Sequence, residues 1–182
     1  MCEKNLLENI HAIHFVGIGG SGMCPLAEIL HTKGYALTGS DNNESDNLKR
    51  IRALGIPVHM GHAAENIKGA DMVVYTAAVS EDNPELVAAK AQHLPLIERA
   101  QLLGFITRRF KNTVAVAGTH GKTTTSSMIA QILLEADKDP SIFIGGRLPL
   151  INANGRAGGS DIMVCEACEL KDHYQAMTPA VS

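Results

Sequence analysis

The sequence predicts an α/β protein built on parallel sheets, and two observations support that prediction. Short apolar runs typical of β-strands alternate along the 182 residues with stretches whose apolar residues recur at helical spacing. Twice, a glycine-rich turn separates an apolar run from the helix that follows it, as in the phosphate-binding loops of parallel α/β folds. Strand–helix–strand units joined by right-handed crossovers place their strands in one parallel sheet with helices on both faces.

The first series of elements predicts a Rossmann-like parallel sheet, which we assign to a domain of residues 1–107. The expected strands are 12–17, 35–39, 58–60, 72–75 and 94–97, and the expected helices are 21–33, 46–54, 85–92 and 98–109. Gly34 and Gly55 favour the ends of the first two helices, and Asn83 followed by Pro84 is a typical helix start.

The second series predicts a further α/β domain over residues 108–182. Its expected strands are 113–117, 141–144 and 162–165, with a helix over 122–136. The segment 145–159 is rich in glycine and asparagine, so we expect a loop there. This series is shorter than the roughly 100 residues usual for such a domain, so we expect the sequence to be the front part of a longer protein with a truncated second domain.

The composition excludes several kinds of protein. Hydrophobic residues make up 45% of the chain and charged residues 19%, which is typical of a soluble globular protein. A net charge of −3, 4% aromatic residues and no tryptophan give neither a basic field nor stacking platforms for nucleic acid. No apolar run is long enough to span a membrane, and four cysteines without an export signal indicate a reducing compartment. We therefore expect a cytoplasmic protein without nucleic-acid or membrane partners; the composition gives no oligomeric state.

The first glycine-rich turn, residues 17–22 (GIGGSG), lies between an apolar run and a helix. Glycine there allows a tight turn and a close approach of the backbone to a diphosphate, which the helix start then binds. We therefore expect Gly17, Gly19, Gly20, Ser21 and Gly22 to contact a nucleotide diphosphate. Asp41 stands at the end of the next strand, where a carboxylate can accept hydrogen bonds from ribose hydroxyls. The composition of residues 39–43 also favours a turn, so Asp41 could instead have a structural role there.

The second glycine-rich turn predicts a P-loop and makes residues 108–182 the expected start of a P-loop ATPase α/β domain. Residues 117–125 (AGTHGKTTT) again connect an apolar run to a helix. In such a loop backbone N–H groups surround phosphate oxygens, Lys122 reaches the terminal phosphates and the Thr123 hydroxyl binds Mg²⁺. One position departs from the general pattern, because Val116 stands where the first glycine is usual.

The apolar run 162–165 delivers Glu166 at its carboxyl end, the edge at which open α/β sheets bind ligands. A carboxylate there could hold Mg²⁺ directly or through water. Cys165 and Cys168 have CxxC spacing, but the chain has no second such pair. We interpret them as core or supporting thiols rather than as metal or redox groups.

The two phosphate loops together favour an enzyme that binds a nucleotide-linked substrate and spends ATP on it. A nicotinamide-dependent oxidoreductase would use only the first loop. A nucleotide-binding module without catalytic activity is the other alternative. Both alternatives stay open at this point.

The motifs resemble those of the bacterial Mur ligases, and within them the branch that joins L-alanine to UDP-N-acetylmuramate. The resemblance rests on residues 14–23 (HFVGIGGSGM), 38–41 (TGSD), 61–66 (GHAAEN), 80–84 (SEDNP), 117–124 (AGTHGKTT) and 144–148 (IGGRL). It implies one domain for the UDP-sugar and a central ATPase domain, of which this chain would contain the opening part. A related alternative is the murein-recycling ligase that adds a tripeptide to the same sugar nucleotide, although its first glycine loop differs.

The resemblance also implies roles for individual residues. The UDP-sugar would contact Gly17, Gly19, Gly20, Ser21 and Gly22 at the diphosphate and Ser40, Asp41 and His62 near the uridine. ATP would be held by Gly118, Thr119, His120, Gly121, Lys122, Thr123 and Thr124, and Mg²⁺ by Thr123 and Glu166, with Lys122 and Glu166 as the catalytic residues. Many relatives have Glu-Ala-Asp-Glu where this chain has residues 166–169 (EACE), which leaves the role of Cys168 open.

The implied reaction is ATP-dependent and passes through an acyl phosphate, in the synthesis of peptidoglycan precursors. We expect ATP and Mg²⁺ as cofactors and UDP-N-acetylmuramate and L-alanine as substrates. We expect the residues that select the amino acid to lie beyond the end of this sequence, so the sequence does not give the amino acid that is added.

Overall fold

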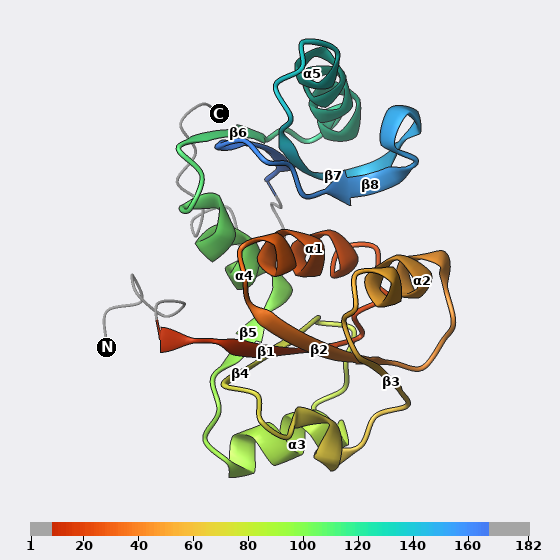
Figure 1. Cartoon of the computed structure of the whole chain (residues 1–182), viewed down its shortest axis with the longest axis vertical. Coiled ribbons are helices and arrows are strands. Elements are labelled where there is room, and N and C mark those ends of the chain that lie inside the picture. Colours follow the sequence, from red (N-terminus) through yellow and green to blue (C-terminus); the bar gives the residue numbers. More distant parts are fainter. Residues whose placement is uncertain (1–8, 168–182) are drawn as a thin grey trace. The chain divides into compact units, whose positions relative to one another are not determined.

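The computed structural model describes residues 9–167 and divides the chain into two compact units, Met1–Arg99 and Ala100–Ser182 (Figure 1). Each unit carries its own sheet. The helix α4 (Arg99–Thr107) starts at the last residue of the first unit.

The first unit is a five-stranded parallel sheet in the order β3-β2-β1-β4-β5. Its strands are β1 (Ala12–Val16), β2 (Ala36–Asp41), β3 (Val58–Met60), β4 (Met72–Tyr75) and β5 (Leu96–Glu98). Its helices are α1 (Cys24–Thr32), α2 (Asp46–Ala53) and α3 (Pro84–Ala91), with a short 3₁₀ helix, η2 (Ala64–Ile67). The strand order reverses between β1 and β4, and the crevice at such a switch point is where open α/β sheets bind ligands.

Helices cover both faces of this sheet, α1 and α2 on one face and α3 on the other (Figure 1). Seven residues of α1 are buried, from Cys24 to Leu30. On the face of α3, Leu86 and Ala89 pack against Val16 and Val73. Because strands such as Ile13–Val16 are buried on both faces, they read as continuous apolar runs rather than as alternating patterns.

The second unit has a four-stranded sheet in the order β6-β9-β7-β8. Its strands are β6 (Asn112–Val116), β7 (Ser141–Leu148), β8 (Ala153–Arg156) and β9 (Ile162–Glu166); its long helix is α5 (Lys122–Glu135), and a short 3₁₀ helix, η3 (Pro149–Ile151), joins β7 to β8. Strands β6, β9 and β7 are parallel, and β8 is antiparallel to β7. A core of Ala130, Ile142, Ile144, Leu148 and Val164 joins α5 to the sheet.

The α/β class and the Rossmann-like sheet expected from the sequence are confirmed. The helix start expected at Asn83 is also confirmed, because its side chain accepts hydrogen bonds from the backbone N–H groups of Glu85 and Leu86. The loop expected over 145–159 was wrong: β7 continues to Leu148 and β8 pairs with it. Glycines are usually a poor sign of a strand. Here Phe143 pairs with β8 and β9 and Leu148 pairs with β8, so sheet pairing holds both ends of the glycine stretch, and the register is irregular between them.

A second correction concerns the first glycine loop, because α1 begins at Cys24 and not at residue 21 as expected. Residues 20–23 instead form turns in which the N–H groups of Met23 and Cys24 donate to the carbonyl of Gly20. The glycine loop therefore lies in these turns, before the first residue of α1.

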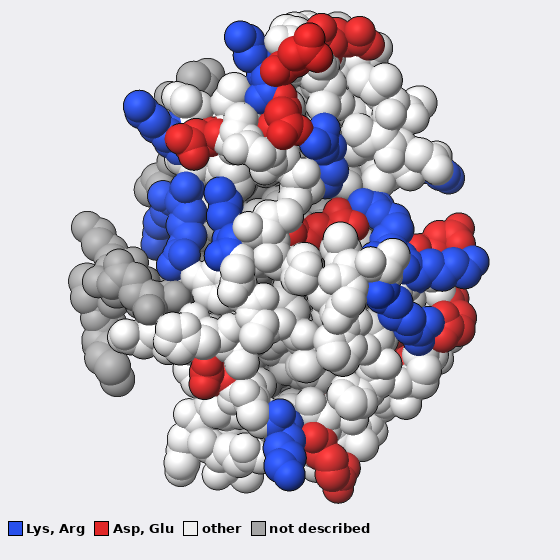
Figure 2. All heavy atoms as spheres, in the orientation of Figure 1, with Lys and Arg blue, Asp and Glu red and all other residues white. Residues whose placement is uncertain are grey.

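Charged side chains do not form one basic field on the first unit. Around α2, basic and acidic residues lie side by side (Figure 2, right), including the ion pairs Lys49–Asp46 and Arg52–Glu44. Within residues 9–167, none of the helices has both the length and the apolar character needed to cross a membrane.

Candidate nucleotide-binding sites

The first glycine loop is fixed to the end of β2 by its backbone. The N–H groups of Gly17 and Ile18 both donate to the carbonyl of Ser40, at 2.8 and 3.0 Å. Gly17 has a φ of +79°, a left-handed conformation that side chains other than glycine's adopt only with strain. The loop therefore turns sharply at the carboxyl end of β1, beside the switch point.

Asp41 shapes this loop from the end of β2. Its Oδ2 accepts the N–H of Gly19 at 2.9 Å, and its Oδ1 accepts the N–H of Asn43 at 3.0 Å. A Cβ on Gly19 would lie 2.9 Å from that Oδ2 and 2.9 Å from the side chain of Leu48, so the protein's own packing requires glycine here. The turn role that the sequence left open for Asp41 is present, and its contact with a ribose stays a prediction.

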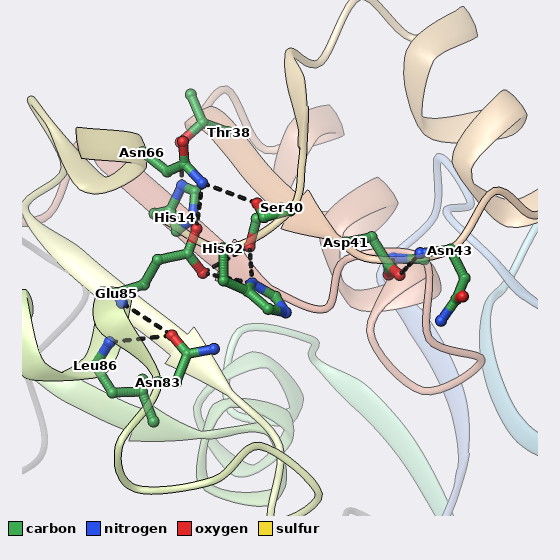
Figure 3. A network of polar contacts seen from close by, with 12 residues as sticks. His14, Thr38, Ser40, Asp41, Asn43, His62, Asn66, Asn83, Glu85 and Leu86 are labelled. Carbon is green, nitrogen blue, oxygen red and sulfur yellow. Dashed lines mark hydrogen bonds and ion pairs between the residues drawn. The ribbon is translucent and has the colours of Figure 1, made fainter. Parts of the chain in front are cut away.

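Ser40 and His62 meet in a buried polar network centred on Glu85 (Figure 3). The Glu85 carboxylate is fully buried and accepts hydrogen bonds from Ser40 Oγ at 2.7 Å and from Asn66 Nδ2 at 2.6 Å. His62 Nδ1 lies 3.0 Å from both Ser40 Oγ and Glu85 Oε2, and His14 Nε2 lies 3.5 Å from Glu85 Oε1. The network therefore connects β1, the end of β2 and the segment that follows β3 with α3.

The hydrogen bonds keep Glu85 ionised. Burial alone raises the pKa of this carboxyl, but the nearby His14 side chain and the hydrogen bonds from Ser40 and Asn66 outweigh burial and lower the pKa to about 2. The sequence predicted Ser40 and His62 near the uridine, which stays a prediction, and gave no role to Glu85, His14 or Asn66. A glutamate in the first turn of a capped helix is ordinary, so the sequence contained no signal for its burial.

The second loop has the backbone of a phosphate loop. Gly118 has a φ of +141° and Gly121 a φ of +77°, and α5 begins directly afterwards at Lys122. The Lys122 ammonium donates to the carbonyl of Gly118, so the side chain lies across its own loop. The N–H of Thr125 donates to the carbonyl of Gly121 at 2.9 Å. The N–H groups that precede it at the start of α5 are the ones that can donate to a bound anion.

Glu166, at the end of β9, faces this helix start. Its Oε1 accepts the N–H of Gly145 at 2.8 Å and the hydroxyl of Ser126 at 3.1 Å. A Cβ on Gly145 would lie 2.8 Å from Glu166 Oε2 and 3.3 Å from Thr123 Oγ1, so both oxygens border the space that this glycine leaves open. Two hard oxygen donors beside such a space fit Mg²⁺, and Thr123 and Glu166 are the residues that would hold it. When bound, the ion would neutralise charge on the phosphate oxygens.

Gly145→Ala should therefore weaken magnesium-dependent ATP binding by at least about tenfold, because the new methyl group occupies the space between the two oxygens. Titration of the variant with ATP, with Mg²⁺ and with EDTA, measures this effect. Binding without Mg²⁺ should be unchanged, and an equal loss with and without the metal would contradict this assignment.

Cys165 is buried and reduced, and burial together with the neighbouring Glu166 charge raises its thiol pKa to about 12. It is therefore an unreactive core thiol, as the sequence suggested. Cys168 lies outside the described residues. Among residues 9–167 there is no group of three or more His, Cys, Asp or Glu side chains placed to hold a metal ion.

A family comparison decides the wider relationship. The model described as "Mur ligase family, catalytic domain" matches residues 12–111, more than half of the chain. The chain belongs to the Mur ligase family. The resemblance seen in the motifs is thus confirmed, and a nicotinamide-dependent oxidoreductase is no longer a competing interpretation.

Individual relatives are similar across both units. The UDP-N-acetylmuramate–L-alanine ligase of Agathobacter rectalis is 52% identical over 183 residues, covering 100% of this chain and 40% of that protein. The structure of UDP-N-acetylmuramate–alanine ligase MurC from Thermotoga maritima superposes with a TM-score of 0.82 at 36% identity, over 92% of this chain and 39% of that one. A UDP-N-acetylmuramate:L-alanyl-γ-D-glutamyl-meso-diaminopimelate ligase from Neisseria meningitides gives 0.77 at 31% identity, over 88% and 53%. The chain spans about two fifths of the length of the curated relatives it matches.

Proposed function

We propose that this Mur ligase chain provides the sugar-nucleotide and ATP-phosphate sites of a UDP-N-acetylmuramate–L-alanine ligase. The observation that carries the proposal is the presence of two phosphate loops, each at the carboxyl edge of its own sheet, in a chain about half identical to such ligases. Each loop has the glycine conformations that its turn requires.

The first unit would bind the UDP half of the substrate. The diphosphate would meet the turn of Gly17, Gly19, Gly20, Ser21 and Gly22, and the uridine would lie near Ser40, Asp41 and His62. Support comes from the position of this turn at the switch point and from the shared anchoring at the Ser40 carbonyl. A backbone site suits a chain without a general excess of basic residues.

The second unit would bind the phosphates of ATP through the loop from Gly118 to Thr124. In the proposed reaction a carboxylate oxygen of UDP-N-acetylmuramate attacks the γ-phosphorus, so that a new O–P bond forms and ADP leaves. The amine of L-alanine then attacks the acyl carbon, the C–N bond forms and phosphate leaves with the electron pair of the C–O bond. Lys122 would neutralise phosphate charge, and the loop would align the reacting groups.

The ligase that adds a tripeptide is the second candidate, because a structure of that activity superposes with a TM-score of 0.77. The alanine ligase is favoured by the higher identity and TM-score of the Thermotoga maritima structure. The cytoplasmic location expected from the sequence stays a prediction, as do the roles of ATP and Mg²⁺.

Thermal unfolding tests the proposal most simply. UDP-N-acetylmuramate at about a hundred times its Kd should stabilise the chain by roughly 2.7 kcal/mol and raise Tm by on the order of 10 °C. NAD⁺ at the same concentration should leave Tm unchanged. A rise with NAD⁺ and none with the sugar nucleotide would refute the proposal.

A further inference from the structure

We propose that Glu85 is a positioning residue of the sugar-nucleotide site, which holds His62 in the tautomer that presents an unprotonated Nε2 to the nucleoside. The inference rests on the proposed function, since it concerns how the first unit reads the nucleoside next to the diphosphate. The roles proposed for the glycine loop and for the P-loop do not depend on this tautomer.

The tautomer follows from the hydrogens that the network contains. Ser40 has a single hydroxyl hydrogen, and it is directed to Glu85 Oε2 at 2.7 Å. An ionised carboxylate has no hydrogen and only accepts. His62 Nδ1 lies 3.0 Å from both of these oxygens, so it must be the donor that carries the remaining hydrogen. In the neutral ring Nε2 then has a lone pair and acts as an acceptor.

The position of His62 makes this tautomer relevant to a ligand. The residue follows β3, and its side chain remains 17% exposed although its Nδ1 lies in the buried network. Figure 3 shows Nδ1 turned towards Ser40 and Glu85 and the other ring nitrogen turned away from them. Glu85 itself is fully buried, so it acts through His62 and does not contact the ligand.

Ser40 joins this network to the glycine loop. Its hydroxyl donates to Glu85, while its carbonyl accepts the N–H groups of Gly17 and Ile18. One residue therefore fixes both the turn that would bind the diphosphate and the partner of His62. A nucleoside attached to that diphosphate is the ligand part that lies within reach of the same strand ends.

An acceptor at this position selects a nucleoside that offers a hydrogen-bond donor, either the imide N–H of the base or the ribose 2′-hydroxyl. UDP has both donors. CDP has an acceptor nitrogen in place of the imide N–H, and 2′-deoxy-UDP lacks the 2′-hydroxyl, so the two analogues distinguish the two sources of the donor. Loss of one such hydrogen bond corresponds to about a tenfold change in Kd.

The test combines histidine tautomers from ¹⁵N NMR with Kd values for UDP, CDP and 2′-deoxy-UDP, all on the complete 182-residue chain. His62 should carry its hydrogen on Nδ1, and one analogue should bind about tenfold more weakly than UDP. Glu85→Gln should weaken UDP binding about tenfold, shift the tautomer towards Nε2–H and remove the discrimination. We expect this result because the amide nitrogen of the introduced glutamine donates and cannot accept. Some of the donors that now face the Glu85 carboxylate would therefore lose their acceptor.

Thr38→Val is the matched control. Thr38 hydrogen-bonds His14 Nδ1 at 2.8 Å within the same network but is hydrogen-bonded to neither Glu85 nor His62. It should lower stability without changing the UDP affinity or the His62 tautomer, whereas a purely structural role for Glu85 would make affinity follow stability in both variants.

An Nε2–H tautomer in the unsubstituted chain would overturn the inference without any variant. Equal binding of the three nucleotides, or unchanged binding by Glu85→Gln, would also overturn it while the proposed function stands. No binding of UDP to the unsubstituted chain would instead refute the proposed function and the inference with it.

Discussion

Lys122→Ala is expected to weaken the binding of Mg·ATP by about 100-fold while leaving the affinity for UDP-N-acetylmuramate unchanged. The ammonium lies across the loop between Gly118 and the start of α5, where it already donates to the Gly118 carbonyl. Its contacts with terminal phosphate oxygens would be charge-assisted hydrogen bonds, worth roughly 1.5–3 kcal/mol. Isothermal titration with each ligand separately measures both effects.

Lys138→Ala is the control for this experiment, because it removes the same charge from an exposed position beyond the end of α5. It should reduce Mg·ATP affinity by less than about twofold, as expected for a screened charge away from the site. An equal effect of the two variants would show that Lys122 contributes only to the general charge of the unit.

Acid should destabilise the first unit through Glu85 by about 3 kcal/mol. The folded-state pKa of about 2 lies below the ordinary value of 4.5, so the unfolded chain binds the proton first as the pH falls. The stabilising contribution is therefore complete above about pH 5 and is lost as the pH falls through the folded-state pKa. Urea unfolding of the chain and of Glu85→Gln between pH 2 and pH 7 measures it.

The two unfolding curves should differ most at neutral pH and converge near pH 2, where the carboxyl of the unsubstituted chain becomes protonated. Other carboxyls, such as Asp71, which accepts the N–H groups of His11 and Ala12, titrate in both proteins and cancel in the difference. A constant difference over the whole range would show that the network does not depend on the charge of Glu85.

The sequence allowed most of the fold to be predicted because the parallel strands are short buried runs bounded by clear turn and cap residues. Asn83 and Pro84 marked the start of α3 correctly. The prediction failed at β7 and β8, where Phe143 and Leu148 pair with other strands on either side of the glycine stretch and hold it in the sheet. Such tertiary pairing overrides the local preference of glycine and cannot be read from a window of residues.

The turns of the two candidate loops were predicted because a local motif specifies their backbone, whereas the polar network around Glu85 was missed because it depends on the assembled sheet. Both glycine loops were found from their own spacing, and positive φ angles at Gly17, Gly118 and Gly121 bear out the need for glycine. The carboxylate of Glu85 meets Ser40 and residues of three other segments only after the sheet has formed. No motif or residue spacing in the sequence indicates that these side chains come into contact.

The central claim, that the first glycine loop binds the sugar nucleotide, is tested most directly by a single change of charge at Ser21. This residue is exposed between Gly20 and Gly22, and an acidic side chain near the start of α1 does not oppose the helix dipole. Ser21→Glu and Ser21→Gln have the same size and differ by one negative charge beside the expected diphosphate.

The measurement is the Kd of UDP-N-acetylmuramate for the unsubstituted chain, for the two Ser21 variants and for Lys122→Ala. The account predicts that Ser21→Glu binds at least about tenfold more weakly than Ser21→Gln, with a larger gap at low salt, and that Lys122→Ala binds normally. Equal binding by the two Ser21 variants, together with a loss in Lys122→Ala, would contradict it and would place the sugar nucleotide at the second loop.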